Sequence, residues 1–188
     1  MKFLKLGLAS LAVSTALFAG TYNVDAGHTN AGFTVKHMMI TNVTGKFNDI
    51  SGSFEFDEKT KTLKSISGEI VTASIDTSNE KRDEHLKSSD LFDAEQFPKI
   101  TFKSTKIEKN KVHGELTMKG ITKVVVLDLE TSDIIKDPWG KQRTGFSLNG
   151  KIKRSDFGIS WNKALETGGV AVSDEVKLAI DMEGVLAN

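Results

Sequence analysis

Four histidines and several nearby carboxylates are the residues of this chain best suited to chemistry. Histidine paired with aspartate is a common arrangement in general acid-base catalysis, and both side chains bind zinc. The histidines are His28, His37, His85 and His113, and the carboxylates that could orient them are Asp25, Asp76 and Asp83. These residue types would suit a hydrolytic or metal-dependent enzyme.

The spacing of the histidines argues against both functions. The sequence contains neither His-Glu-x-x-His nor Gly-x-Ser-x-Gly, the spacings typical of metalloproteases and serine hydrolases. His28 and His37 are nine residues apart, so a regular strand would point them to opposite faces. His113 has the opposite parity to apolar Val112 and is expected to face solvent. The chain also lacks cysteine, which excludes thiolate ligands, thiol nucleophiles and disulfides. We therefore expect no enzyme activity, no bound metal and no other cofactor.

The first twenty residues have the composition of an export signal. Lys2 and Lys5 precede an apolar run over residues 6–18, and small residues follow at Ala19 and Gly20. This arrangement is typical of a secretory signal peptide. We predict a signal peptide at residues 1–19, with cleavage after Ala19 favoured over cleavage after Gly20, and export to the periplasm.

The remaining residues 20–188 suffice for one domain with a hydrophobic core. Lysine and arginine together number 25, as do aspartate and glutamate, so the even charge balance excludes a nucleic-acid-binding protein that needs a concentrated basic surface. No later segment approaches the roughly 20 apolar residues of a membrane span. We expect no stable membrane anchor, and the oligomeric state stays open, a dimer included.

Alternation of apolar and polar residues dominates this domain. In "FTVKH", Phe33, Val35 and His37 share one face, and about eight segments show the same period of two, which predicts half-buried strands. An antiparallel sheet of this kind has two edges, and closure into a barrel removes them. The fold class expected is all-β, an eight-stranded antiparallel barrel, and a β-sandwich is the competing architecture.

The stretch "EKRDEHLKSSDLF" interrupts the strand pattern. Thr77 and Glu80 have the spacing of a capping box, which predicts that a helix begins near Ser78. This helical insertion, near residues 78–92, ends in the apolar pair Leu91 and Phe92. The segment either covers a hollow barrel or seals one barrel end as ordinary core.

Several segments resemble the YceI-like family of exported, lipocalin-like proteins. The resemblance rests on "VDAGHTNAGFTVKH", "TGKF", "SIDTSNEKRDEHLKSSDLFDAEQFPKITFKST", "GELTMKGITK", "KRSDFGI" and "DEVKL". It implies an elongated lipocalin-like barrel across residues 20–188, with a deep apolar pore. It further implies a long-chain ligand such as a polyisoprenoid, an isoprenoid quinone or a fatty amide, carried or stored.

The expected ligand-binding residues face the barrel lumen or its mouth. They are Phe33, Val35, His37, Phe47, Leu86, Phe92, Phe102, Leu116, Phe146, Phe157, Ile159 and Trp161. Glycines within strands are expected to leave the lumen partly unfilled, and the four concerned are Gly45, Gly68, Gly114 and Gly150. Headgroup selection would use polar groups at the mouth, and the candidates are His37, Arg82, His85, Arg154, Asp156 and Trp161.

The long loop 155–172 is expected to act with the segment 86–92 as a gate, since loops of this length are usually functional or mobile. Two rival functions remain at this point. A barrel filled by its own side chains would be a stress or interaction module, and a histidine-aspartate metal site would suit an enzyme.

Overall fold

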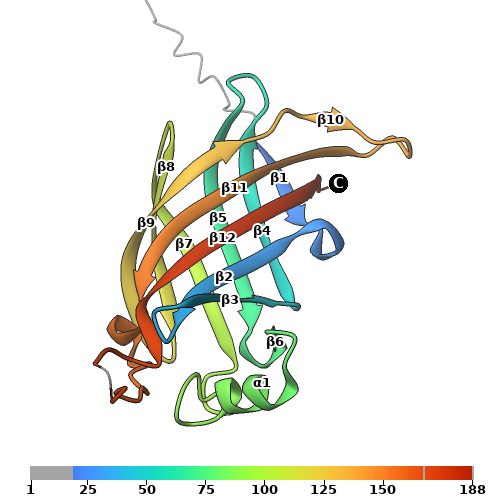
Figure 1. Ribbon diagram of the computed structural model, residues 1–188. Helices are drawn as coiled ribbons and strands as arrows, with labels where there is room; N and C mark the ends of the chain where they lie inside the picture. Colours follow the sequence, from blue (N-terminus) through green and yellow to red (C-terminus); the bar gives the residue numbers. More distant parts are fainter. Residues whose placement is uncertain (1–18, 167, 188) are drawn as a thin grey trace, which may run out of the picture.

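The structure is a computed structural model that describes residues 19–166 and 168–187. Twelve strand segments and short helices follow one another along the chain (Figure 1). The strands are β1 (Ala19–Val24), β2 (Asn30–His37), β3 (Thr41–Phe47), β4 (Ile50–Asp57), β5 (Thr62–Val71), β6 (Ile75–Asp76), β7 (Lys99–Glu108), β8 (Lys111–Met118), β9 (Ile121–Thr131), β10 (Ile135–Lys136), β11 (Gln142–Lys153) and β12 (Val172–Leu186). The α-helix α1 spans Glu80–Lys87, and the 3-10 helices are η1 (Ala26–His28), η2 (Thr72–Ser74) and η3 (Arg154–Phe157).

Eight of the strands close into a ring. The order is β11, β9, β8, β7, β5, β4, β1 and β12, and β12 pairs back onto β11. All of these neighbours are antiparallel. The predicted eight-stranded antiparallel barrel is confirmed, with the helical insertion between β6 and β7. The ring closes because β12 pairs with β11 on one side and with β1 on the other; the 15 residues of β12 also reach β2.

Counted along the chain, the first three strands of the barrel each consist of two segments, and only one segment of each is named in the ring above. η1 separates β1 from β2, Asn48 and Asp49 separate β3 from β4, and η2 separates β5 from β6. The turn of η2 changes the side-chain parity between β5 and β6. Ser74 joins two of the breaks, since its hydroxyl donates to Val71 O at 2.7 Å and accepts from Asp49 N at 3.0 Å.

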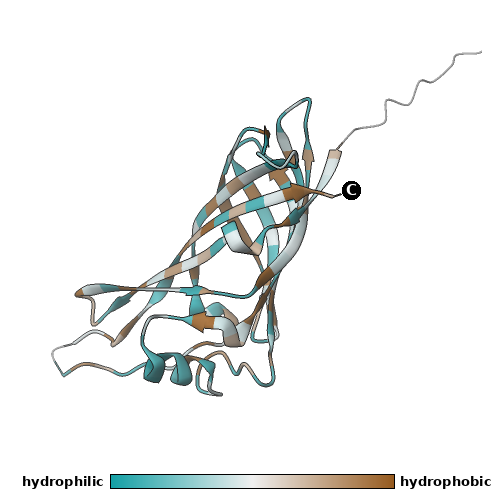
Figure 2. Ribbon diagram, turned by 90° about the vertical axis from the view of Figure 1, so that its right-hand side faces the viewer, coloured by the Kyte–Doolittle hydropathy of each residue, from teal (hydrophilic) through white to brown (hydrophobic). Residues whose placement is uncertain are grey.

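The barrel is elongated and its two ends differ (Figure 1). One end holds β10 and the C-terminus, and we call it the upper end. The other end holds α1, whose residues are mainly hydrophilic (Figure 2), and we call it the lower end. The signal peptide predicted at residues 1–19 lies outside the described residues except for Ala19, which pairs with Asp57.

The upper half of the barrel interior is filled by side chains. Tyr22 stacks on Phe54 at a centroid distance of 5.4 Å, and Phe146 meets Phe54 edge-on at 5.1 Å. This upper core comprises Tyr22, Phe54, Phe56, Leu63, Ile66, Val112, Leu127, Leu129, Phe146 and Leu148. A second cluster, the lower core, comprises Leu91, Ile100, Met118, Ile152, Phe157, Ile159 and Val176.

Three of the four interior glycines do not leave empty space, contrary to the expectation from the sequence. A Cβ at Gly45 would collide with the ring of Phe33, and one at Gly114 would collide with the ring of Phe102. Gly150 is covered in the same way by Leu127. A bulky neighbour therefore occupies the space over each glycine, and only Gly68 of the four has ordinary contact distances around it.

An ion-pair network closes the upper end. Arg143 Nη1 donates to Asp25 Oδ2 and to Glu183 Oε1, both at 2.6 Å, and its Nε donates to Asp137 Oδ2 at 2.8 Å. The hydrogen bond from Arg143 is the main cause that lowers the pKa of Asp25 from 3.8 to about 2 and also holds the pKa of Asp137 below its usual value. One guanidinium thus ties η1, β12 and the β10 segment together.

We expect acid to remove the stability that this network contributes. Because the carboxyl pKa values are lower in the folded chain than in the unfolded chain, the contribution is complete above about pH 5 and is lost as the pH falls towards about 2. Arg143→Met should lower the melting temperature at neutral pH, and the difference from wild type should shrink over this interval. Circular dichroism melts at constant ionic strength provide the measurement, and parallel pH profiles for the two proteins would contradict it.

Candidate functional site

A cavity of about 360 Å³ occupies the lower half of the barrel. Its walls are apolar side chains from β2, β3, β5, β7, β8, β11 and β12, and the upper core closes it at the inner end. The wall residues include Phe33, Val35, Val43, Phe47, Ile70, Ile100, Leu116, Met118, Ile152, Val176, Leu178 and Ile180. Ligand pockets in proteins commonly have volumes of about 300 to 1,000 Å³, so this cavity is of a size that binds small molecules.

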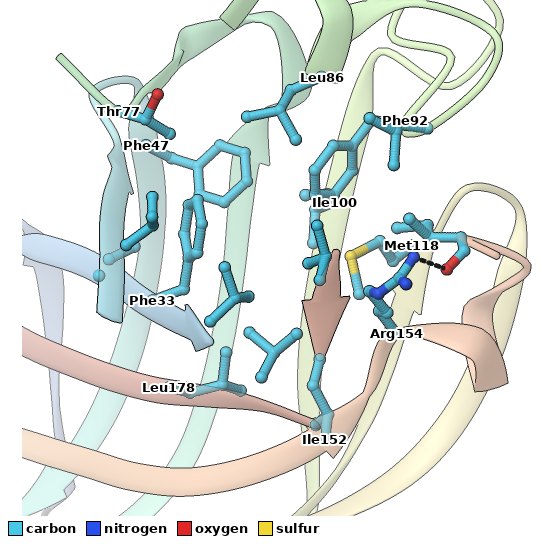
Figure 3. Close-up of a pocket in the computed structure, with 18 of the residues that line it drawn as sticks. Phe33, Phe47, Thr77, Leu86, Phe92, Ile100, Met118, Ile152, Arg154 and Leu178 are labelled. Atoms are coloured by element: carbon cyan, nitrogen blue, oxygen red, sulfur yellow. Dashed lines mark hydrogen bonds between the residues drawn. The ribbon is translucent and has the colours of Figure 1, made fainter. Parts of the chain in front are cut away.

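The helical insertion covers part of the cavity. Leu86, Leu91 and Phe92 line it from the side of α1. Phe92 meets Phe47 edge-on at 5.9 Å, and Phe47 lies 5.8 Å from Phe33 between ring centroids. Figure 3 shows these three rings on one side of the cavity and Ile152 and Leu178 opposite Leu86. Leu86 of α1 and the apolar residues that follow the helix therefore close the lumen, and Arg82 and His85 of α1 border it.

The start of α1 differs from the predicted capping box. Asn79 is the N-cap, and its side chain accepts from Arg82 N at 3.1 Å. The Thr77 hydroxyl instead donates to Asp83 Oδ1 and accepts from Arg82 Nε at 2.7 Å. Ser78 has a φ of 59°, so the chain turns away from the helix axis before Asn79 and Thr77 cannot cap. The predicted cap at Thr77 and Glu80 is therefore wrong, and Thr77 anchors the insertion to the barrel mouth.

Arg154 holds the long loop that borders the other side of the mouth. Its guanidinium donates to the carbonyl oxygens of Ile159 and Trp161 at 2.8 Å, and to that of Ser173 at 3.0 Å. Burial is the main cause that lowers the pKa of Arg154. Across the mouth, Trp161 meets His85 of α1 edge-on at 4.8 Å. Loop and helix therefore touch directly at the cavity, and their action as a gate stays a prediction.

Nine of the twelve predicted site residues line the cavity. They are Phe33, Val35, His37, Phe47, Leu86, Phe92, Leu116, Ile159 and Trp161. The structure places the other three elsewhere. Phe146 belongs to the upper core, Phe102 packs against that core, and Phe157 is buried in the lower core. Phe146 and Phe102 point inward as predicted, but side chains fill the upper half of the lumen.

Five of the six headgroup candidates lie at the cavity and the sixth does not. His37, Arg82, His85, Arg154 and Trp161 are lining residues, whereas Asp156 is exposed outside the lining. Arg82 and Arg154 already donate to backbone carbonyls, Arg82 to Thr77 O at 2.7 Å. His37 is exposed at the rim, so its imidazole is better placed than either guanidinium to meet a polar group.

The prediction from sequence missed several lining residues that share the inward parity. Ile100, Met118, Ile152 and Ile70 lie on strands whose alternation was visible, and each lines the cavity. Their parity could have identified them. Ala171 and Val172 also line it, and no periodic signal marks the end of a long loop.

The histidines do not gather around one centre. His37 and His85 lie at the cavity, whereas His28 lies at the upper end beside Asp25 and Glu183. Donor atoms of those last three residues lie within 4.8 Å of one another, but Arg143 Nη1 donates to both carboxylates. The guanidinium therefore already supplies the positive charge that these carboxylates need.

Comparison with known proteins identifies the family. The family model for a YceI-like domain matches residues 22–184. The chain belongs to the YceI-like family. A UPF0312 protein of Staphylococcus aureus (strain N315) is 39% identical over 163 residues, which cover 86% of this chain and 95% of that protein. The resemblance inferred from the sequence motifs is therefore confirmed.

Several solved structures share the fold. The Campylobacter jejuni YceI protein has 34% sequence identity and a TM-score of 0.70, with both chains fully covered. Burkholderia cenocepacia BcnA has 26% identity and a TM-score of 0.69 over 85% of this chain and 98% of its own. A polyisoprenoid binding domain from Saccharophagus degradans has 16% identity and a TM-score of 0.67 over 88% of this chain and 98% of its own, and this shows a common fold.

Proposed function

We propose that this YceI-like protein binds the hydrocarbon part of a long-chain amphiphile in the lower cavity, for transport or storage. The observation that carries the proposal is the unfilled apolar cavity of about 360 Å³ between the upper core and the cap. A polyisoprenoid, an isoprenoid quinone or a fatty amide has the required apolar chain. The polyisoprenoid binding domain of Saccharophagus degradans, which has the same fold, supports this class of ligand.

The size of the cavity sets how much of a chain it holds. Water occupies roughly 30 Å³ per molecule in the liquid, so the cavity accepts about a dozen groups of that size. Each buried methylene contributes about 0.8 kcal/mol, and ten of them give roughly 8 kcal/mol before the several kcal/mol lost in ordering. Long chains should therefore bind and short chains should not, and the remainder of a longer tail would extend through the mouth.

Polar groups at the rim would meet the headgroup. His37 is exposed there, and His85 and Trp161 border the same opening. The nine predicted residues that line the cavity are the proposed ligand-binding residues. We propose a non-catalytic role without metal or cofactor, because the lining is mostly apolar and its polar side chains within the described residues include no carboxylate that could pair with His37 or His85.

We also propose that the protein is exported to the periplasm. The support is the composition of residues 1–19, which has the basic, apolar and small-residue regions of a signal peptide. Within residues 19–166 and 168–187, no helix has the length and apolar character needed to cross a bilayer.

The test is to identify what the protein carries when it is purified from cells. Native mass spectrometry without detergent, followed by organic extraction, should reveal one lipid per barrel, with a chain of at least about ten carbons. Protein that emerges empty and stays empty when mixed with isoprenoid quinone or fatty amide would reject the proposal. Elemental analysis of the same sample tests the rival metal site.

A further inference from the structure

Three consecutive apolar residues are exposed at the turn between β2 and β3. Met38, Met39 and Ile40 are 43%, 57% and 74% exposed, and we call them the 38–40 tip. Single exposed apolar residues are ordinary on protein surfaces, whereas a contiguous apolar patch commonly marks an interaction site. This tip projects from the barrel wall on the hairpin of β2 and β3 (Figure 1).

The backbone of the tip disfavours the residues that it carries. Met38 and Met39 have φ values of 50° and 60°, and Ile40 N donates to His37 O at 2.9 Å. Positive φ at both central residues of a hairpin turn favours asparagine, aspartate and glycine. Two methionines at these positions cost stability, and strain of this kind is often retained for function.

The tip adjoins the mouth of the cavity. His37, the residue before it, and Ala171 both line the cavity. Met38 N donates to Ala171 O at 2.8 Å, and Ala171 N donates to Lys163 O at 2.9 Å. Hairpin and loop 155–172 thus lie side by side, as Figures 1 and 2 both show. A surface that receives the tip is therefore in contact with the opening through which a lipid enters.

Two exposed lysines lie close to the tip. Lys36 and Lys163 are exposed on the hairpin and on the loop, and within the described residues neither amino group is in an ion pair. Asp156 and Glu166 are the exposed acidic residues of the loop 155–172, whereas Lys163 is the residue whose backbone is bonded to Ala171 beside the tip. Apolar side chains beside lysines suit the interface of a bilayer with anionic headgroups.

We propose that the 38–40 tip inserts into the surface of an anionic lipid bilayer and places the cavity mouth against it, so that the ligand passes between membrane and barrel. This inference rests on the proposed function, since it names the place from which the ligand is taken. Contact is peripheral and reversible, because three side chains at one turn form a small buried area.

The variant Met38→Asn, Met39→Gly and Ile40→Thr tests the tip without threatening the fold, since asparagine and glycine suit positive φ. Its melting temperature should equal or exceed that of wild type. Flotation with vesicles of phosphatidylcholine and about 30% phosphatidylglycerol should give at least about a tenfold smaller bound fraction than wild type. Wild-type binding should also fall on vesicles of phosphatidylcholine alone.

A matched control changes the exposed apolar residues at the upper end. Ile135 and Trp139 are 58% and 81% exposed, and Ile135→Ser with Trp139→Ser should bind vesicles as wild type does. Equal binding by the tip variant, no binding by wild type, or loss of binding in the control would each overturn docking at the tip. A protein partner would be the occupant if wild type ignored all vesicles. Lipid occupancy measured on the same samples separates the two proposals, because a failure of docking leaves occupancy intact.

Discussion

Leu178→Asp should abolish ligand binding while Ala179→Asp leaves it unchanged. Leu178 faces the cavity (Figure 3), and Ala179, the next residue of β12, is exposed on the outer face. A carboxylate against a bound alkyl chain has no partner, and burying it costs several kcal/mol, which corresponds to an affinity loss of about 100-fold or more. The outer-face control carries the same charge on the same strand.

Titration with an isoprenoid quinone provides the measurement, since Trp161 lines the mouth and its fluorescence should be quenched. Water reaches Leu178→Asp through the open mouth when the cavity is empty, so the variant should fold. Leu178→Trp is a second, uncharged variant that fills the space and should also exclude the ligand. Wild-type affinity in both folded variants would be incompatible with binding in this cavity.

Phe146→Ala should have the opposite effect, with a large loss of stability and little loss of binding. Phe146 is 3% exposed and packs edge-on against Phe54 in the upper core. Truncating a buried phenylalanine to alanine typically costs about 3 to 5 kcal/mol, because apolar contact is lost and a cavity remains. The ligand cavity lies in the other half of the barrel, so the folded fraction should bind as wild type does.

Phe33→Ala is the matched comparison for this prediction. Phe33 is half-buried and lines the cavity, so its truncation should weaken binding more and stability less. Guanidinium chloride unfolding gives the stability and quinone titration well below the melting temperature gives the affinity. If Phe146→Ala proves too unstable to purify, Phe146→Leu provides the same comparison with a smaller loss of folding stability. Equal losses of affinity in the Phe146 and Phe33 variants would mean that the ligand reaches the upper half.

Both experiments depend on a division of the lumen that inward parity alone does not reveal. Phe146 and Leu178 lie on the paired strands β11 and β12 and both point inward. Tyr22 and Phe54, from strands far away in the sequence, pack with Phe146 in the upper core. Leu178 instead faces the cavity. The proposed docking at the 38–40 tip gives a reason for the cavity to lie in the lower half of the barrel, since the tip adjoins the mouth of the cavity there.

The sequence by itself determined the all-β fold, the positions of most strands, the helical insertion and the inward face of each strand. These are local properties, because alternation with period two fixes which side chains share a face once the sheet has one buried side. It also determined the family, through long motifs such as "SIDTSNEKRDEHLKSSDLFDAEQFPKITFKST".

Only the tertiary structure decided which inward residues meet a neighbour and which face a cavity. The sequence could not show that Phe33 covers Gly45 or that Phe102 covers Gly114, because filling depends on how separate strands are staggered. It likewise could not place Ala171 beside Met38. Packing is a property of side chains brought together from distant positions, so the volume of a lumen follows from the closed barrel and not from any one strand.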